Sequence, residues 1–153
     1  MDVSVIIVNY NTRDLTLDCI ASIKNNTRDL LYEIIVVDNA SQDDSIKAIK
    51  QDHPDVCVIE STSNLGFGAA NNLGTSKSTG KYLFYLNSDT ILLNNAIKCF
   101  FDFAESSIEQ IGAIGCILKD SAGNNIHSFG PFINIKNEAR ILFSKYFRFL
   151  KDR

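Results

Sequence analysis

The sequence has no run of about 18 apolar residues, the length that a helix needs to cross a membrane, so we predict no membrane-spanning segment. Its first residues, MDVSVIIVNYN, lack the basic region and the small-residue cleavage site of a signal peptide. Excess positive charge is missing too: 15 Lys and Arg stand against 18 Asp and Glu, a net charge of −3. This balance argues against nucleic acid as a partner. We expect a cytoplasmic protein.

Closely spaced cysteines are absent as well. The four cysteines stand at positions 19, 57, 99 and 116, a spacing that matches no C-x-x-C metal or redox motif. We predict reduced thiols in the protein core. His53 and His127 lie far apart, each without a neighbouring Cys or second His, so we assign them no catalytic or metal-binding role. A G-x-S-x-G nucleophile elbow is also missing.

What is present is enough apolar sequence for a core, since 45% of the 153 residues are hydrophobic and 22% are charged. Short apolar runs alternate with amphipathic stretches, without repeats or a Pro/Gly/Ser-rich linker. This alternation predicts an α/β fold with a mostly parallel sheet flanked by helices. The expected strands are 3–8, 33–37, 56–59, 81–86 and 111–118, and the expected helices are 13–25, 41–49, 69–78 and 94–105.

Single residues mark the expected ends of these elements. Thr12 or Asn11 is the expected N-cap of the first helix, and Ser41 that of the second. Gly80 stands where a helix C-terminal stop is expected. Residues 120–123 are typical of a turn, with a partner strand expected near 125–129.

Polar clusters follow the first four expected strands, at the edge where ligands bind in open α/β sheets. They are Asn9-Tyr10-Asn11, Asp38-Asn39, Ser63-Asn64 and Asn87-Ser88-Asp89. Asp89 either ligates a hard divalent cation that neutralises a diphosphate, or caps the next turn. Asp38 either accepts a hydrogen bond from a base or ribose, or shapes its own turn. Tyr10 either stacks on a base or packs under the loop.

The stretch 64–74, NLGFGAANNLG, resembles a glycine-rich phosphate loop. It follows the third strand rather than the first, Asn71 replaces the third small residue, and no P-loop lysine comes after it. Two interpretations stay open. The backbone either approaches a ligand at a helix N-terminus, or its small residues allow a helix to pack closely on the sheet.

Residues 131–153 form a segment of different character. Within 136–153, basic residues and apolar residues fall on opposite faces of a helix, which predicts a basic amphipathic helix. Two interpretations are open here too. The segment either contacts an anionic membrane peripherally, or packs on a further part of the protein or on a second copy in a homo-oligomer.

Five stretches are similar to one known family: VSVIIVNYN, EIIVVDNASQDDS, NLGFGAANNLG, KYLFYLNSDTIL and IGAIGCIL. Over residues 3 to 130 the sequence resembles the N-terminal, donor-binding part of a family 2 glycosyltransferase, and most of all the rhamnosyltransferase-like branch that builds surface polysaccharides. The resemblance implies a Rossmann-like GT-A nucleotide-sugar-binding domain over 1–130, truncated at its C-terminal side.

The resemblance also implies a nucleotide-diphosphate sugar as donor. The implied donor-binding residues are Val8, Asn9, Tyr10, Asn11, Asp38, Asn64, Gly68, Asn71, Asn87 and Ser88. Asp89 would hold Mg²⁺ or Mn²⁺ against the diphosphate. Asn87 stands where the family's Asp-X-Asp motif has its first acid, which leaves Asp89 as the main anionic ligand.

The expected reaction is an inverting transfer of the sugar to a glycan or lipid-linked acceptor, at the inner face of the cell membrane. The family's catalytic base lies in a later Glu-Asp motif, which this sequence does not contain, so the catalytic residue is unknown. The alternative is a catalytically inactive nucleotide-sugar-binding module. A nucleotidyltransferase ranks last, because Asn9-Tyr10-Asn11 replaces the glycine-rich basic loop expected after its first strand.

Overall fold

The computed structural model describes residues 1–108 and 111–126. The chain divides into two compact units, residues 1–110 and 111–153. The basic amphipathic segment predicted at 131–153 lies outside the described residues, as does His127. Among the described residues, no helix combines the length and apolar character needed to cross a membrane.

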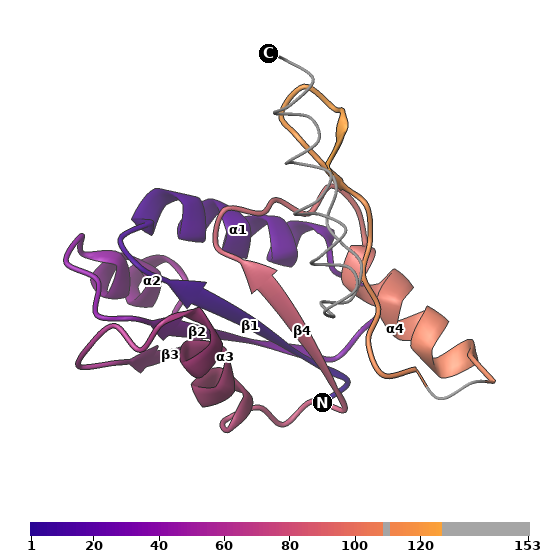
Figure 1. Ribbon diagram of the computed structural model, residues 1–153, viewed down its shortest axis with the longest axis horizontal. Helices are drawn as coiled ribbons and strands as arrows, with labels where there is room; N and C mark the ends of the chain where they lie inside the picture. The colour runs from indigo at the N-terminus through magenta and orange to yellow at the C-terminus, as the bar shows by residue number, and fades with distance from the viewer. Residues whose placement is uncertain (109–110, 127–153) are drawn as a thin grey trace, which may run out of the picture. The chain divides into compact units, whose positions relative to one another are not determined.

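The first unit alternates strands and helices along the chain. Its elements are β1 (Val3–Asn9), α1 (Arg13–Asn26), β2 (Tyr32–Asp38), α2 (Ser45–Asp52), β3 (Cys57–Glu60), α3 (Phe67–Thr75), β4 (Tyr82–Asn87) and α4 (Ala96–Ser106). The strands pair in parallel in the order β3-β2-β1-β4 (Figure 1). This arrangement confirms the predicted α/β class, with element bounds shifted by a few residues.

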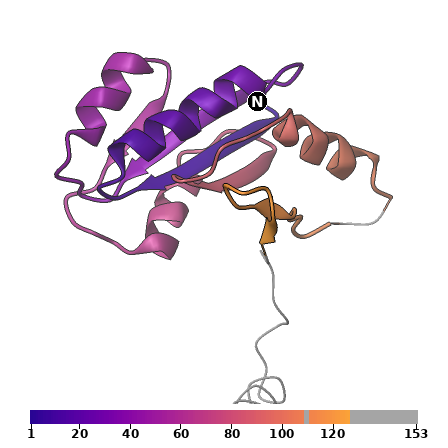
Figure 2. The same ribbon diagram turned by 90° about the horizontal axis from the view of Figure 1, so that it is seen from above.

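Helices cover both faces of this sheet, as Figure 2 shows. On one face, Val5 of β1 packs in a cluster with Ile20 of α1 and Ile49 of α2. On the other face, Ile35 of β2 packs with Ala70 of α3. The strands β1 and β2 are therefore buried on both faces, which explains why their sequences are continuous runs of β-branched residues.

The strand β4 lies close to its expected range, 81–86, but it is less buried than β1 and β2. Its side chains alternate between half-buried and exposed positions, and Leu83 and Tyr85 are 39% and 50% exposed. On the half-buried side, Tyr82 packs edge-on against Phe101 of α4, with 5.8 Å between ring centroids. Within the described residues β4 pairs only with β1, so it forms an edge of the sheet.

Two residues predicted as helix boundaries have other roles. The helix α2 begins at Ser45, after Asp44 with φ of 60°, so Ser41 does not cap it. Gly80 lies beyond the end of α3, where a Cβ would come within 2.4 Å of the backbone nitrogen of Ser4. Glycine is needed there because the chain entering β4 approaches β1 closely, and not because a helix ends there.

The described part of the second unit is a small hairpin. The strands β5 (Leu118–Lys119) and β6 (Asn125–Ile126) are antiparallel. The predicted turn between them is confirmed, because Asp120 accepts the Gly123 N–H through its carbonyl and binds two further N–H groups through its carboxylate. The predicted strand at 111–118 is wrong: only its last residue is in a strand.

The cysteines agree only in part with the prediction. Cys19, Cys57 and Cys99 are free thiols, but only Cys19 lies in the core, and Cys57, Cys99 and Cys116 are exposed. Burial, reinforced by the charge of Asp89, raises the pKa of the Cys19 thiol to about 12. Cys19 is therefore a protonated core residue at neutral pH.

Candidate functional site

The last residue of β1 lies at the centre of a buried polar network. Asn9 has no exposed surface. Its side-chain NH₂ donates to Asp38 Oδ2 at 2.7 Å and to Ser41 Oγ at 2.9 Å. Its Oδ1 accepts hydrogen bonds from the hydroxyls of Thr12 at 2.8 Å and Thr16 at 2.7 Å. The amide uses its full hydrogen-bonding capacity to join the ends of β1 and β2 to the start of α1.

Asp38 is the partner of Asn9 in the β1–β2 register and is also fully buried. Besides the Asn9 amide, its carboxylate accepts the Ser41 N–H at 2.8 Å through Oδ1. The carboxylate therefore shapes the turn that follows β2, as one of the two interpretations proposed. Each of its oxygens can accept a second bond, but the side chain has no exposed surface, so the predicted contact with a base or ribose needs the covering loop to move and stays a prediction.

The segment after β4 joins the same network through hydroxyl groups. The Oγ atoms of Thr12 and Ser88 lie 3.1 Å apart, in hydrogen-bonding distance. Asn87 and Asp89 on either side are exposed. Within the described residues, the Asp89 carboxylate takes part in no hydrogen bond or ion pair. The predicted Asn87-Ser88-Asp89 cluster thus lies beside Asn9, with one carboxylate available to a ligand.

The loop after β1 is fastened to the loop after β2. Asn11, with φ of 54°, donates its N–H to Ser41 Oγ at 3.0 Å and accepts the Gln42 N–H through Oδ1 at 2.7 Å. Tyr10 between them is 49% exposed. Val8 is half-buried and packs against the cluster beneath α3. The loop is therefore fixed while the Tyr10 ring stays accessible at the edge of the sheet.

A second pair of amides joins the loops after β2 and β3. Asn39 donates its side-chain NH₂ to Asn64 Oδ1 at 2.8 Å and accepts the Leu65 N–H through Oδ1 at 2.8 Å. Asn64 also accepts the Gly66 N–H at 2.9 Å. Asn64 thus holds the start of the glycine-rich stretch next to the turn formed by Asp38.

The two interpretations of the glycine-rich stretch apply to different residues. A Cβ at Gly74 would lie 2.7 Å from Ile6 Cγ2, and Ala70 is fully buried, so these two positions serve close packing of α3 on the sheet. A Cβ at Gly68 would meet nothing within 4 Å, so packing does not require glycine there. Asn71 is half-buried and bonds a backbone carbonyl one turn earlier.

The residues present fit one kind of metal binding. Among the described residues, no group of three His, Cys, Asp or Glu side chains could hold a metal ion. Mg²⁺, however, is commonly bound through one or two carboxylates together with phosphate oxygens and water. The exposed Asp89 carboxylate suits an ion that arrives with a diphosphate, rather than one resident in the protein.

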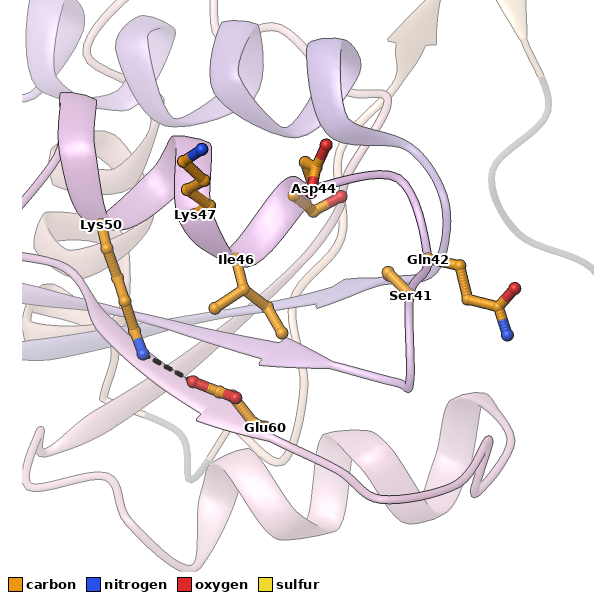
Figure 3. A pocket seen from close by; sticks show the side chains of 8 residues that line it. Ser41, Gln42, Asp44, Ile46, Lys47, Lys50 and Glu60 are labelled. Atoms are coloured by element: carbon orange, nitrogen blue, oxygen red, sulfur yellow. Dashed lines mark hydrogen bonds and ion pairs between the residues drawn. The ribbon is translucent and has the colours of Figure 1, made fainter.

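A hollow of ≈ 570 Å³ lies between α2 and β3 and is a weaker candidate site (Figure 3). Lys50 and Glu60 form an ion pair across it at 2.5 Å. Ser41 lines this hollow and also belongs to the Asn9 network. None of the predicted donor-binding residues lines the hollow. We therefore locate the candidate site at the carboxyl ends of β1, β2 and β4.

Sequence reasoning assigned helix capping to Thr12 and Ser41, and no role to Thr16. Thr12 does occupy the N-cap position of α1, but its side chain makes no cap hydrogen bond. A signal was present, because Asp side chains often bond the backbone a few residues later, and Ser41 follows Asp38 by three residues. Thr16 follows Thr12 by four residues, so both lie on one face of α1.

Comparison with known proteins adds a family match. The model of a family described as "Glycosyl transferase family 2" matches residues 4–149. A poly(ribitol-phosphate) beta-glucosyltransferase from Bacillus spizizenii is 33% identical over 116 residues, which cover 72% of this chain and 18% of that protein.

Two solved structures share the fold. S. aureus TarS in complex with UDP-GlcNAc matches 69% of this chain and 31% of its own, with a TM-score of 0.61 and 22% identity. The mannosyltransferase PcManGT from Pyrobaculum calidifontis, in complex with GDP-Man and Mn²⁺, matches 61% of this chain and 29% of its own, with a TM-score of 0.55 and 27% identity. The predicted GT-A fold is confirmed. The chain spans less than a third of the length of each of these three proteins.

Proposed function

The chain belongs to the family 2 glycosyltransferases, and on this basis we propose that it binds a nucleotide-diphosphate sugar at the carboxyl ends of β1, β2 and β4. The observation that carries the proposal is the Asn9 network, which joins these three strand ends between the exposed Tyr10 and the exposed Asp89. The complexes of TarS with UDP-GlcNAc and of PcManGT with GDP-Man and Mn²⁺ support a donor of this class.

In this proposal the two exposed residues bind opposite ends of the nucleotide. The Tyr10 ring stacks on the base, and Asp38 accepts a hydrogen bond from the base or ribose. Asn64, Gly68 and Asn71 lie along the donor, where Gly68 leaves room for its approach. The amide of Asn87 bonds a sugar hydroxyl. Asp89 holds Mg²⁺ or Mn²⁺, and this ion would neutralise the charge of the departing diphosphate.

The proposed reaction is an inverting transfer of the sugar to a glycan or lipid-linked acceptor in surface polysaccharide synthesis. The Bacillus spizizenii relative is named a poly(ribitol-phosphate) beta-glucosyltransferase, and this name contains a polymer. It supports the proposal of a polymeric acceptor. We place the reaction in the cytoplasm, where the free thiols Cys19, Cys57 and Cys99 stay reduced. Residues 136–153 would either contact the inner face of the membrane or pack on a further part of the protein or on a second copy.

A second candidate function is donor binding without transfer. Transfer needs a base to deprotonate the acceptor hydroxyl. Of the described acids after Asp89, however, Asp102 pairs with Lys98, Glu105 binds Lys81, and Asp120 closes its own turn. Each of these described acids already has a local structural partner, and this observation favours donor binding without transfer by the described part of the chain.

Calorimetry with UDP, dTDP and GDP, each with and without Mn²⁺, tests donor binding. We expect one of the three nucleotides to bind. Mn²⁺ held by Asp89 should raise its affinity about tenfold, which is the gain in affinity expected from a single charge-assisted contact. Asp89→Asn should remove the Mn²⁺ effect, because a neutral amide is a weak ligand for a hard cation. Asp102→Asn, a surface carboxylate paired with Lys98, is the matched control and should keep the effect. If none of the three nucleotides binds the wild-type chain, the proposal is wrong.

Turnover separates the two candidate functions. The chain is incubated with the donor whose nucleotide binds best, with and without lipid-linked acceptors, and release of nucleoside diphosphate is measured. Acceptor-dependent release by the chain alone identifies a transferase, whereas tight binding without release identifies a binding module.

A further inference from the structure

We propose that Thr12 is a positioning residue, which sets Ser88 and thereby Asp89 for metal-assisted binding of the diphosphate. The inference rests on the proposed function and deepens it. It concerns one contact, the 3.1 Å hydrogen bond between the hydroxyls of Thr12 and Ser88, which connects residues 76 apart in the sequence.

The donor and the acceptor of each hydrogen bond between Asp38, Asn9, Thr12 and Ser88 can be assigned. The NH₂ group of Asn9 donates to the Asp38 carboxylate, so its Oδ1 faces Thr12 as an acceptor. Thr12 has a single hydroxyl hydrogen, which it donates to that oxygen. The bond to Ser88 must then be donated by Ser88. Ser88 is thus orientated by a chain of donors that ends at a buried carboxylate, and its lone pairs are left for a ligand.

Thr12 is one of two side chains that hold the near end of the segment carrying Asp89. The other is Cys19, whose thiol donates to the Asn87 carbonyl at 3.6 Å. At the far end of this segment, the Leu92 N–H donates to Ser22 Oγ at 3.0 Å, and Asn26 donates to the Leu92 carbonyl at 2.8 Å. The Ser88 hydroxyl makes its described hydrogen bond to Thr12. Asp89 lies between these two ends, and removal of the Thr12 hydroxyl takes away the hydrogen bond to Ser88, the residue directly before it.

The same contact links the two halves of the proposed donor site. Thr12 follows Tyr10 and Asn11 directly, at the start of α1. A shift of Ser88 towards or away from Thr12 therefore changes the spacing between the base side of the site, at Tyr10, and the metal side, at Asp89. A nucleoside diphosphate contacts both sides at once, so its metal-dependent affinity reports on this spacing.

The test is Thr12→Val, which keeps the shape of the side chain and removes its hydroxyl. The affinity of the nucleoside diphosphate that binds the wild-type chain, among UDP, dTDP and GDP, is measured with and without Mn²⁺. We expect the tightening by Mn²⁺ to fall about fivefold, the equivalent of one lost hydrogen bond, while metal-free affinity changes little. Thr12→Ser retains the hydroxyl and should restore the effect.

Two further variants separate positioning from a general loss of stability. Ser4→Ala removes a buried hydroxyl at the opposite end of β1, which donates to Glu33 and does not contact Ser88. It should lower the thermal stability and leave the Mn²⁺ effect at the wild-type level. Ser88→Ala should reduce the Mn²⁺ effect as Thr12→Val does, and the double variant no further, because both remove the same bond.

The outcomes are distinguishable from failure of the proposed function. If the wild-type chain binds a nucleotide with Mn²⁺ dependence and both Thr12→Val and Ser88→Ala retain it in full, the positioning role is overturned. An equal loss in Ser4→Ala also overturns it, since the effect would then come from a general loss of stability. If Thr12→Val does not fold, Ser88→Ala decides by itself. Absence of any nucleotide binding by the wild-type chain instead refutes the proposed function.

Discussion

The two ends of the sheet carry similar polar pairs that have different consequences. In the β1–β2 register, Ser4 lies opposite Glu33 at the amino end and Asn9 lies opposite Asp38 at the carboxyl end. In each pair the β1 side chain donates to the β2 carboxylate, at 2.6 Å and 2.7 Å. The amino-end cluster consists of Ser4, Glu33, Thr79 and Gly80, and the carboxyl-end cluster of Asn9, Thr12, Thr16, Asp38, Ser41 and Ser88.

The clusters differ in how they reach β4. At the amino end the connection is made mainly by backbone: the Gly80 N–H donates to Ser4 Oγ at 2.8 Å, and the Thr79 N–H donates to Glu33 at 2.7 Å. The Thr79 hydroxyl adds one side-chain bond to Glu33, at 2.8 Å. At the carboxyl end it is made by side-chain hydroxyls, next to exposed residues. Close backbone contact leaves no room for a ligand, whereas hydroxyls leave unused lone pairs. The same strand pairing therefore forms a structural contact at one end and a candidate site at the other.

Among substitutions in the two clusters, Asn9→Ala should cause the largest loss of stability. It removes four hydrogen bonds, two of them buried and two part-buried, and takes from the buried Asp38 carboxylate one of its two donors. We expect a loss of about 4 kcal/mol in the free energy of unfolding, measured by urea denaturation. Ser4→Ala at the other end should cost only about 1 kcal/mol, because its partners keep other donors or access to water. Equal costs would contradict the difference drawn between the two ends.

Gly80→Ala should cause the second largest loss of stability. The added Cβ would lie 2.4 Å from the Ser4 backbone nitrogen, so β1 and the entry to β4 must separate. We expect a loss of about 3 kcal/mol in unfolding free energy. Gly68→Ala is the matched control, since its Cβ meets nothing within 4 Å, and should leave stability nearly unchanged. A tolerated Gly80→Ala would show that the amino-end contact is looser than described.

Glu33→Gln should have the smallest effect, and it should depend on pH. Burial acts to raise the pKa of Glu33, but hydrogen bonds from Ser4 and Thr79 outweigh it and hold the pKa below its ordinary value of 4.5. A carboxyl with a lowered pKa stabilises the fold above its ordinary pKa, and this contribution is lost as the pH falls through the lowered value. We expect the variant to be less stable by about 1 kcal/mol at neutral pH.

The measurement for Glu33→Gln is urea denaturation of both proteins between pH 7 and about pH 3. The difference in unfolding free energy between wild type and variant should narrow as the pH falls, because protonated Glu33 resembles Gln. A difference independent of pH would mean that the charge of Glu33 contributes nothing to stability.

Much of the fold could be predicted from the sequence, because local patterns report burial directly. The β-branched run of β1 and the amphipathic α1 were predicted nearly within their observed bounds. The grouping of the candidate site residues also followed from physics, since the carboxyl ends of parallel strands share one edge and polar residues follow each of them. That a donor binds there stays a prediction.

What could not be predicted depends on contacts distant in sequence. Ser41 precedes a helix and is a residue type common at N-caps. Its hydroxyl instead accepts hydrogen bonds from Asn9 and Asn11, some 30 residues earlier. Gly80 follows a helix and is the residue type that commonly ends one. Glycine is instead required there because the Ser4 backbone lies so close to it. The apolar run at 111–118 predicted a strand, but a strand also needs a partner, and its described residues pair only at Leu118.

The order of these contacts along the chain has a consequence for folding. Both β1–β2 pairs connect residues 29 apart, so β1, α1 and β2 can assemble by closing one short loop. The contacts to β4 connect residues as far as 76 apart at both ends of the sheet. Contacts of long sequence separation form late, because the entropy of closing the larger loop must first be overcome. We therefore expect β4 to dock last, so that Asp89 takes its place beside Asn9 only in the final step of folding.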